Sequence, residues 1–116
     1  IIDISATFRD ITGAIYPKTV NGNKTKDPVG KSLLPIFKGK KREPHKEIYW
    51  HFGSANAIRQ GDLKAVRQGR SAWELYDLRL DPTEINNLAK IKPEKTRELG
   101  QMWESWSKEI KSRPGK

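Results

Sequence analysis

Apolar and polar residues alternate most regularly near the end of the chain. Between positions 93 and about 112, five apolar residues recur at helical spacing: Leu99, Met102, Trp103, Trp106 and Ile110. Pro114-Gly115 then stops the pattern. The spacing predicts one long amphipathic helix whose apolar stripe has to lie on another apolar surface.

Four short segments before this helix have the composition of β-strands: 47–52, 55–60, 63–68 and 73–78. In the first segment, Ile48, Trp50 and Phe52 share one face, and Tyr49 and His51 share the other. Gly61-Asp62 separates the second and third segments and suits a two-residue hairpin turn with glycine first. The short connections predict an antiparallel meander, which is the surface for the long helix.

The first third of the chain has less regular structure. Residues 3–12 place Ile4, Phe8 and Ile11 on one stripe and predict a short helix, capped by Asp3 or Ser5 and ended by Gly13. Residues 15–30 are rich in Pro, Gly, Asn and Lys, and they predict a loop without a regular element. A brief apolar turn follows at 33–37, begun by Ser32 and closed by Gly39.

The segment 81–88 has the spacing of a helix start. Asp81 is placed at the N-cap, Pro82 at the first helical position and Glu84 at the third, which predicts a short helical turn through Ile85. Leu88 is then free to pack on the sheet. The predicted fold class is α+β, with a small four-stranded antiparallel sheet packed by one long C-terminal helix and preceded by a short helix and a long loop.

Composition limits the size of the core and the available chemistry. The 116 residues are 34% hydrophobic with a mean hydropathy of −0.82, so the core is small. The chain has no cysteine, which excludes disulfides, zinc thiolates and thiol catalysis within it. It begins at Ile1 without a leader pattern, so we expect a cut or processed start, and no apolar run predicts a membrane partner.

The net charge of +9 favours an anionic partner. The densest basic run, residues 38–46, contains Gly39 and Pro44 and is typical of a solvated loop, and basic and acidic residues alternate elsewhere. No zinc-finger, RNA-recognition or basic-zipper motif is present, so we expect no nucleic-acid partner. A free-standing binding module for sulfated polysaccharide, or less so for nucleic acid, is the alternative function.

Few residues offer catalytic or ligand chemistry. Capping accounts for Asp81 and Glu84, while His45 and His51 have no third ligand at metal spacing, so the sequence predicts neither a catalytic residue nor a metal site. The triplet 23–25, Asn-Lys-Thr, matches a glycosylation acceptor that matters only in a eukaryotic secretory setting. His51 lies beside the turn at Gly53 and near Arg59 and Lys64, which makes it a candidate for contact with an anionic substrate, and a solvent-exposed strand histidine without such a role is the alternative.

Four blocks of the sequence resemble sulfatases of the arylsulfatase type. WELYDLRLDPTEINNLA (73–89) resembles the family's closing segment, E-L-Y-D-L followed by D-P-x-E and N-L-A. DISATFRDITG (3–13), GKSLLPIFKG (30–39) and YWHFGSANAIRQGDLKAV (49–66) resemble three further family blocks in the same order. Ala6, Leu63 and Ala65 depart from usual family residues, and His51 stands where an acidic residue is common.

The resemblance implies a two-part enzyme, a sulfuric ester hydrolase with a large α/β catalytic domain and a small C-terminal subdomain. Residues 1–45 then form the tail of the large domain and its connecting loop, and residues 46–116 form the C-terminal subdomain. The partners implied are the missing N-terminal catalytic domain and a sulfate-ester substrate. Export to the periplasm, the extracellular space or the lysosome is typical of the family.

Family chemistry uses a formylglycine, made in a C/S-x-P-x-R motif, and a calcium ion, and neither the motif nor the metal ligands occur in this chain. The fragment alone is therefore expected to be inactive. The resemblance implies that the subdomain forms one wall of the substrate pocket, with the loop between its first two strands as the natural contributor. We expect the substrate-binding candidates there to be His51, Asn56 and Arg59.

Overall fold

The computed structural model describes residues 2–111 of the chain. They belong to two compact units, Ile1–His45 (unit 1) and Lys46–Lys116 (unit 2), which are described separately. None of the helices in the described residues is both long and apolar enough to span a bilayer.

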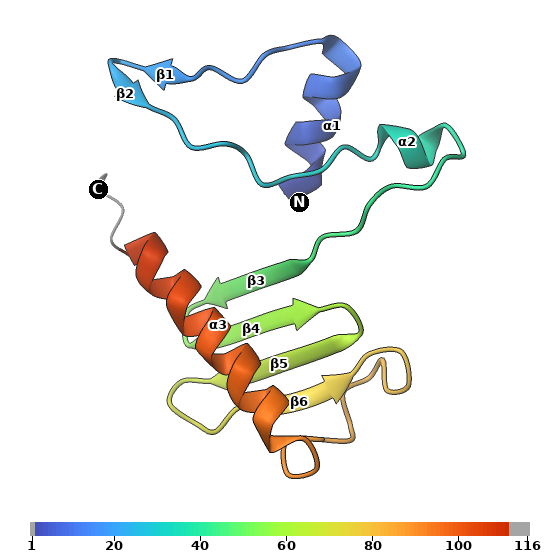
Figure 1. The fold of residues 1–116 in the computed structure, drawn as a ribbon, viewed down its shortest axis with the longest axis vertical. Coiled ribbons are helices and arrows are strands. Elements are labelled where there is room, and N and C mark those ends of the chain that lie inside the picture. The colour runs from blue at the N-terminus through green and yellow to red at the C-terminus, as the bar shows by residue number, and fades with distance from the viewer. Residues whose placement is uncertain (1, 112–116) are drawn as a thin grey trace. The chain divides into compact units, whose positions relative to one another are not determined.

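Unit 2 is built on a four-stranded antiparallel sheet with strand order β3-β4-β5-β6 (Figure 1). Its strands are β3 (Glu47–Phe52), β4 (Ala55–Gln60), β5 (Leu63–Gln68) and β6 (Glu74–Asp77). Two-residue turns join β3 to β4 and β4 to β5, and each begins with a glycine at positive φ, Gly53 at 55° and Gly61 at 59°. Glycine in this position suits the turn twist that hairpins favour. The predicted meander is confirmed, with the fourth strand shorter than 73–78.

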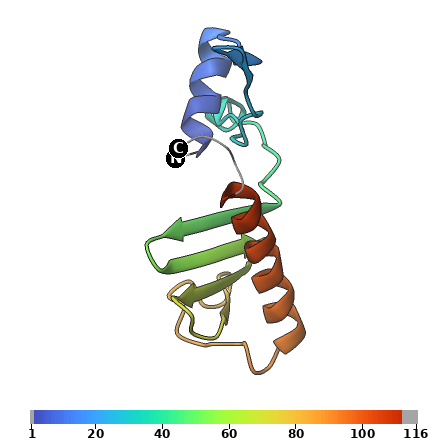
Figure 2. The ribbon, with the colours of Figure 1, turned by 90° about the vertical axis from the view of Figure 1, so that its left-hand side faces the viewer.

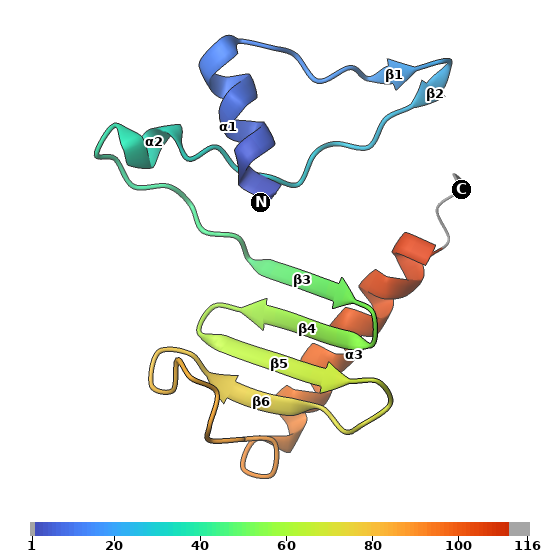
Figure 3. The same ribbon diagram turned by 180° about the vertical axis from the view of Figure 1, so that it is seen from behind.

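Helix α3 (Pro93–Lys111) lies across one face of this sheet, as Figures 2 and 3 show from two sides. A buried cluster joins the two layers: Ile58, Ala65, Leu75, Leu99 and Trp103. Burying a large apolar side chain stabilises a fold by about 1.5–3 kcal/mol, so this cluster is the main source of cohesion. The predicted α+β class is confirmed, while the predicted helix end near 112 and stop at Pro114-Gly115 lie outside the described residues.

Aromatic side chains extend the core along α3. Tyr49 stacks on Trp106 with ring centroids 4.9 Å apart and an interplanar angle of 11°. Trp103 makes tilted contacts with Trp73 and with Trp106. These three tryptophans are on the helix-covered side of the sheet, whereas Trp50 is 44% exposed on the other side. Most of the aromatic set therefore supplies packing.

The segment after β6 contradicts one prediction, because residues 81–85 do not form a helical turn. The carboxylate of Asp81 accepts hydrogen bonds from the backbone N–H groups of Ile85 and Asn86, at 3.1 and 2.7 Å. These bonds lower the pKa of Asp81. Glu84 adopts a left-handed φ of 56°, which no helix allows. The capping carboxylate closes a loop instead of starting a helix.

Pairing with β6 explains why the loop is preferred. The side-chain oxygen of Asn87 accepts from the Leu75 N–H at 3.1 Å, and the Leu88 N–H donates to the Leu75 carbonyl at 2.7 Å. These bonds satisfy the outer edge of β6, which a helix would leave unpaired. Leu88 then packs against the core, as predicted.

Unit 1 contains two short helices and a small hairpin: α1 (Ile2–Thr12), β1 (Thr19–Val20), β2 (Asn23–Lys24) and α2 (Leu34–Phe37). The prediction that 15–30 has no regular element is wrong, because Asn21 and Gly22 adopt φ values of 50° and 78° and form a hairpin turn. The predicted stripe of α1 exists but remains exposed, with Phe8 at 63% and Ile11 at 57%.

Candidate functional site

The strand register gathers three polar side chains in one row. His51 of β3 lies opposite Asn56 of β4, and Asn56 lies opposite Arg67 of β5. All three are on the face covered by α3, at the sheet end next to the Gly53-Ser54 turn. We call His51, Asn56 and Arg67 the polar row. The loop between β3 and β4, which the family resemblance singles out, is thus flanked by two of the three predicted residues, side by side.

His51 and Asn56 are joined directly. The His51 Nδ1 atom lies 2.8 Å from the Asn56 Oδ1 atom, and the Asn56 amide nitrogen donates to the Ser54 carbonyl at 3.3 Å. Asn56 is buried, while His51 is exposed. The imidazole also contacts Trp103, with ring centroids 5.8 Å apart. The pair therefore offers one fixed, accessible imidazole.

Trp103 packs against the His51 ring and holds the helix in place beside the His51–Asn56 pair. Its indole N–H donates to the Trp50 carbonyl at 2.9 Å, which ties α3 to β3 immediately before His51. The Ser54 hydroxyl accepts from Gln68 at 2.7 Å, so the turn is also tied to β5. These bonds limit motion of the turn that carries the candidate residues.

Arg67 supplies the positive charge of the polar row. Its guanidinium carbon lies 4.6 Å from the ring centroid of Trp73 and 5.6 Å from that of Trp103. One nitrogen reaches Glu104 at 3.3 Å, while the buried Nε atom has no hydrogen-bond partner among the described residues. Stacking on two indoles holds the cation in a mostly apolar environment.

Sequence reasoning did not select Arg67, although the signal was present. Two-residue turns at 53–54 and 61–62 fix which residues face each other, so position 51 meets 56 and 56 meets 67. Counting residues across both turns places Arg67 on the same face of the sheet as His51.

Arg59 does not join the other two predicted residues. It lies on the opposite face of the sheet and near the other end, where its Nε atom donates to the Gly61 carbonyl at 2.8 Å. Lys64 is on that same face and pairs with Glu84 at 2.5 Å. The three candidates therefore do not form a single cluster.

The uncovered face of the sheet carries an apolar surface, which we call the outer face and define by Trp50, Phe52, Ala55, Ala57 and Val66. Phe52 is 86% exposed. These residues line a shallow hollow of about 330 Å³ whose border includes Lys64 and Glu74. At its rim the Tyr76 hydroxyl donates to Glu74 at 2.6 Å, and this bond, together with burial, raises the pKa of Tyr76 to about 12.

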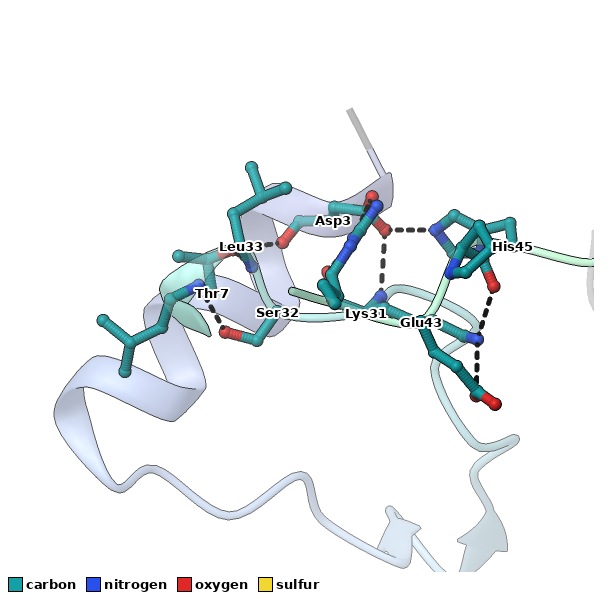
Figure 4. A network of polar contacts seen from close by, with 10 residues as sticks. Asp3, Thr7, Lys31, Ser32, Leu33, Glu43 and His45 are labelled. Atoms are coloured by element: carbon teal, nitrogen blue, oxygen red, sulfur yellow. Dashed lines mark hydrogen bonds and ion pairs between the residues drawn. The ribbon is translucent and has the colours of Figure 1, made fainter. Parts of the chain in front are cut away.

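A second polar cluster, the Asp3 clamp, lies in unit 1 and consists of Asp3, Lys31, Arg42 and His45. Figure 4 labels three of these, Asp3, Lys31 and His45. The Asp3 carboxylate accepts from the Lys31 N–H at 2.9 Å, from His45 Nε2 at 2.7 Å and from Arg42 at 2.8 Å. Burial alone would raise the pKa of Asp3, but these bonds together hold it well below its usual range. Because protein donors surround both oxygens, the clamp joins α1 to segment 31–45 and offers no free base.

The histidine and acidic side chains of the described residues do not form a ligand set for a metal ion. No group of three or more His, Cys, Asp or Glu side chains in residues 2–111 is arranged to hold a metal ion. The carboxylate and amide clusters expected around calcium do not match the isolated acidic residues found. Residues 2–111 therefore do not fit a calcium centre.

The chain is similar to known sulfatases over nearly its whole length. Residues 1–111 match the sequence profile of the family described as N-sulphoglucosamine sulphohydrolase, C-terminal. An uncharacterized sulfatase of Schizosaccharomyces pombe is 32% identical over 89% of this chain and 20% of its own length. An N-acetylglucosamine-6-O-sulfatase of Bacteroides thetaiotaomicron is 29% identical over 95% of this chain and 21% of its own length.

Solved structures are also similar to this chain over nearly its whole length. A 6S-sulfatase of Bacteroides thetaiotaomicron, from a locus for the metabolism of multiple glycosaminoglycans, has a TM-score of 0.68 at 26% identity over 96% of this chain. A protein solved with its substrate, D-glucosamine-2-N,6-O-disulfate, has a TM-score of 0.63 at 26% identity over 97% of this chain. The match covers 24% of each structure, and the chain spans about a fifth to a quarter of all these relatives. The predicted resemblance is confirmed, and the chain belongs to the N-sulphoglucosamine sulphohydrolase C-terminal family of sulfatases.

Proposed function

We propose that this chain is the C-terminal part of a sulfatase that hydrolyses sulfate esters of glucosamine-type sugars, and that its subdomain 46–116 shapes one wall of the substrate pocket. One observation carries the proposal: the family match extends over residues 1–111 yet fills only about a fifth to a quarter of each relative. The catalytic residues then belong to the remaining part of the enzyme, and the subdomain alone is inactive.

Exposed apolar surfaces support a large missing partner. The outer face leaves Phe52 86% exposed and Trp50 44% exposed. The α1 stripe leaves Phe8 63% exposed. Apolar surfaces of this kind mark interaction sites, so we assign both surfaces to contacts with the catalytic domain.

The names of relatives support the substrate class. One relative is an N-acetylglucosamine-6-O-sulfatase, and one similar structure was solved with a glucosamine disulfate as its substrate. For this chain we propose a sulfated glucosamine unit, contacted by His51 of β3 with Asn56 of β4 behind it, beside the turn that joins the two strands. Arg59, on the other face, is assigned to contact with the catalytic domain. Calcium and formylglycine are proposed for that domain, and export for the whole enzyme.

The complete reading frame that contains this chain provides the test. We expect it to encode a C/S-x-P-x-R motif upstream, and the purified protein to release sulfate from glucosamine 6-sulfate, while the 116-residue chain alone releases none. A reading frame without that motif, or a full protein that is inactive on sulfated sugars and aryl sulfates, would contradict the proposal.

Variants of the full enzyme separate the proposed roles. His51→Ala should raise KM for the sulfated sugar with the unfolding temperature unchanged. Arg59→Ala should lower the unfolding temperature with KM unchanged. Lys90→Ala, at an exposed loop position, is the matched control and should change neither value. If Arg59→Ala raises KM, Arg59 belongs to the pocket instead.

The net charge of +9 also suits a free-standing module for sulfated polysaccharide. Heparin chromatography of the chain tests this alternative. Diffuse attraction is screened at physiological salt, so we expect elution there, whereas retention well above it would favour a specific polysaccharide site.

A further inference from the structure

The orientation of the Asn56 amide is determined by its neighbours. One end of the amide faces the Ser54 carbonyl oxygen at 3.3 Å. A carbonyl oxygen only accepts hydrogen bonds, so the group that faces it has to be the amide nitrogen. The amide oxygen of Asn56 is therefore the atom that faces His51, 2.8 Å from Nδ1.

This orientation determines the protonation pattern of His51. Because the Asn56 oxygen only accepts, the His51 Nδ1 atom has to carry the proton of this hydrogen bond. In a neutral imidazole the other nitrogen, Nε2, then carries a lone pair. His51 is exposed, and its Nε2 atom has no hydrogen-bond partner among residues 2–111.

Packing holds the imidazole in this orientation. The ring lies against Trp103 with centroids 5.8 Å apart, and Trp103 is bound to the Trp50 carbonyl. The Ser54 carbonyl that orients the amide also accepts from the Gly69 N–H at 2.8 Å, and the Ser54 hydroxyl accepts from Gln68 at 2.7 Å. The ring is therefore fixed before any ligand arrives, which lowers the entropic cost of binding.

We propose that Asn56 is a positioning residue that fixes His51 as the Nδ1–H tautomer, so that Nε2 accepts a hydrogen bond from a hydroxyl group of the sugar. A neutral acceptor repels a sulfate oxygen, so His51 recognises the sugar ring next to the ester and not the sulfate. This assignment rests on the proposed function for the identity of the ligand, but the tautomer does not depend on it.

NMR of the ¹⁵N-labelled whole chain at pH 8.5 tests the tautomer. Long-range ¹H–¹⁵N spectra distinguish a protonated nitrogen from a bare one in each imidazole. His45 is an internal control, because its Nε2 atom faces the acceptor-only carboxylate of Asp3. We therefore expect opposite tautomers in one spectrum, with Nδ1–H at His51 and Nε2–H at His45, and His51→Gln assigns the signals.

Substitution of Asn56 shows whether it is the cause. Asn56→Ala should convert a large fraction of His51 to the Nε2–H form and leave His45 unchanged. Asn56→Asp keeps an acceptor in place and should retain the Nδ1–H form. Nε2–H at His51 in the unmodified chain, or no change in Asn56→Ala, would overturn the inference even if the full enzyme is a sulfatase.

Kinetics of the full enzyme test the hydroxyl contact. With glucosamine 6-sulfate, His51→Ala should raise KM about tenfold, the effect of one lost hydrogen bond. The 3-deoxy and 4-deoxy analogues should each be compared in both proteins. With one of these two analogues, His51→Ala should no longer raise KM, because the hydroxyl that donates to Nε2 is already missing. Full additivity with both analogues would refute the hydroxyl contact and leave the sulfatase assignment intact.

Discussion

The two units are stabilised by different forces. Unit 2 buries Ile58, Leu75 and Leu99 completely between its sheet and α3. In the described part of unit 1, only Ala6 and Thr7 are buried, and the Asp3 clamp makes the main connections between its segments. Hydrophobic burial therefore dominates in one unit, and charged hydrogen bonds dominate in the other.

This difference identifies the unit that gains less from its own packing. Unit 1 exposes large apolar side chains on α1 and on the chain that follows, including Ile15 at 92% and Val29 at 76%. A unit that leaves its apolar side chains outside gains little from burial, so its order rests mainly on the clamp. Unit 2 instead buries its large apolar side chains between its own sheet and helix.

The largest effect is expected when a buried side chain in the core of unit 2 is shortened. Leu99→Ala leaves a cavity beneath the sheet and should lower the free energy of unfolding by about 2–5 kcal/mol. All four tryptophans are in unit 2, so urea unfolding followed by tryptophan fluorescence reports this unit alone. Leu80→Ala, at a position 73% exposed, is the control and should stay near the parent value. Equal effects of both variants would show that no such core exists.

A second substitution should disrupt unit 1 and leave unit 2 unchanged. A Cβ atom at Gly30 would lie 2.1 Å from the Ile2 carbonyl oxygen, and backbone cannot move aside as a side chain can. Gly30→Ala should destabilise unit 1 by about 3 kcal/mol, at the upper end of overpacking costs. Amide exchange at Lys31 and Leu33 should accelerate, while the tryptophan transition stays in place. Val29→Ala is the adjacent control.

Removal of the clamp charge should have a somewhat smaller effect. Asp3→Asn weakens charge-assisted bonds to Arg42 and His45 and should cost unit 1 about 2 kcal/mol. Faster amide exchange at Lys31 measures the loss. Asp10→Asn, on the same helix and exposed, is the matched control and should have little effect.

Acid should reproduce the effect of Asp3→Asn. The pKa of Asp3 is lower in the folded chain than in the unfolded chain, where it is near 3.9. The clamp is therefore at full strength above about pH 5 and weakens as the pH falls toward the folded pKa. NMR signals of unit 1 should shift below about pH 4 in the parent chain. A parent chain that responds to acid no more than Asp3→Asn would contradict the clamp.

The smallest effect is expected at the contact between α3 and Trp73. Alanine normally stabilises a helix by about 1 kcal/mol relative to glycine. A Cβ atom at Gly100 would lie 2.7 Å from the Trp73 indole nitrogen, so the ring has to shift. The net result of Gly100→Ala should be a loss of about 1 kcal/mol in the tryptophan transition. Ser105→Ala, at an exposed position of the same helix, is the control and should be neutral or stabilising. If Gly100→Ala is also neutral or stabilising, the packing between Gly100 and Trp73 is loose.

Local patterns were sufficient to predict most of unit 2. The bounds of the first three strands follow from alternation and from glycine-first turns at Gly53 and Gly61, which act within a few residues. The loop after Asp81 was mispredicted because its conformation depends on pairing between Asn87 and Leu75, twelve residues apart. In this loop, hydrogen bonds between residues distant in sequence outweigh the local helix propensity.

The candidate site was predictable only in part. His51 and Asn56 were selected, and strand register places them together. Arg59 was grouped with them because it is near in sequence, although alternation points it to the opposite face. The Asp3 clamp joins residues 28 to 42 positions apart, so no local pattern indicates it.

The length of the two hairpin turns has one further consequence. A single residue inserted at Gly53-Ser54, with the turn kept at two residues, would shift the pairing of β3 with β4 by one position and exchange the faces of one strand. Asn56 would then no longer stand beside His51, and an apolar core residue would turn outward. Insertions that keep the fold at this turn should therefore come in even numbers, or be absorbed by a bulge.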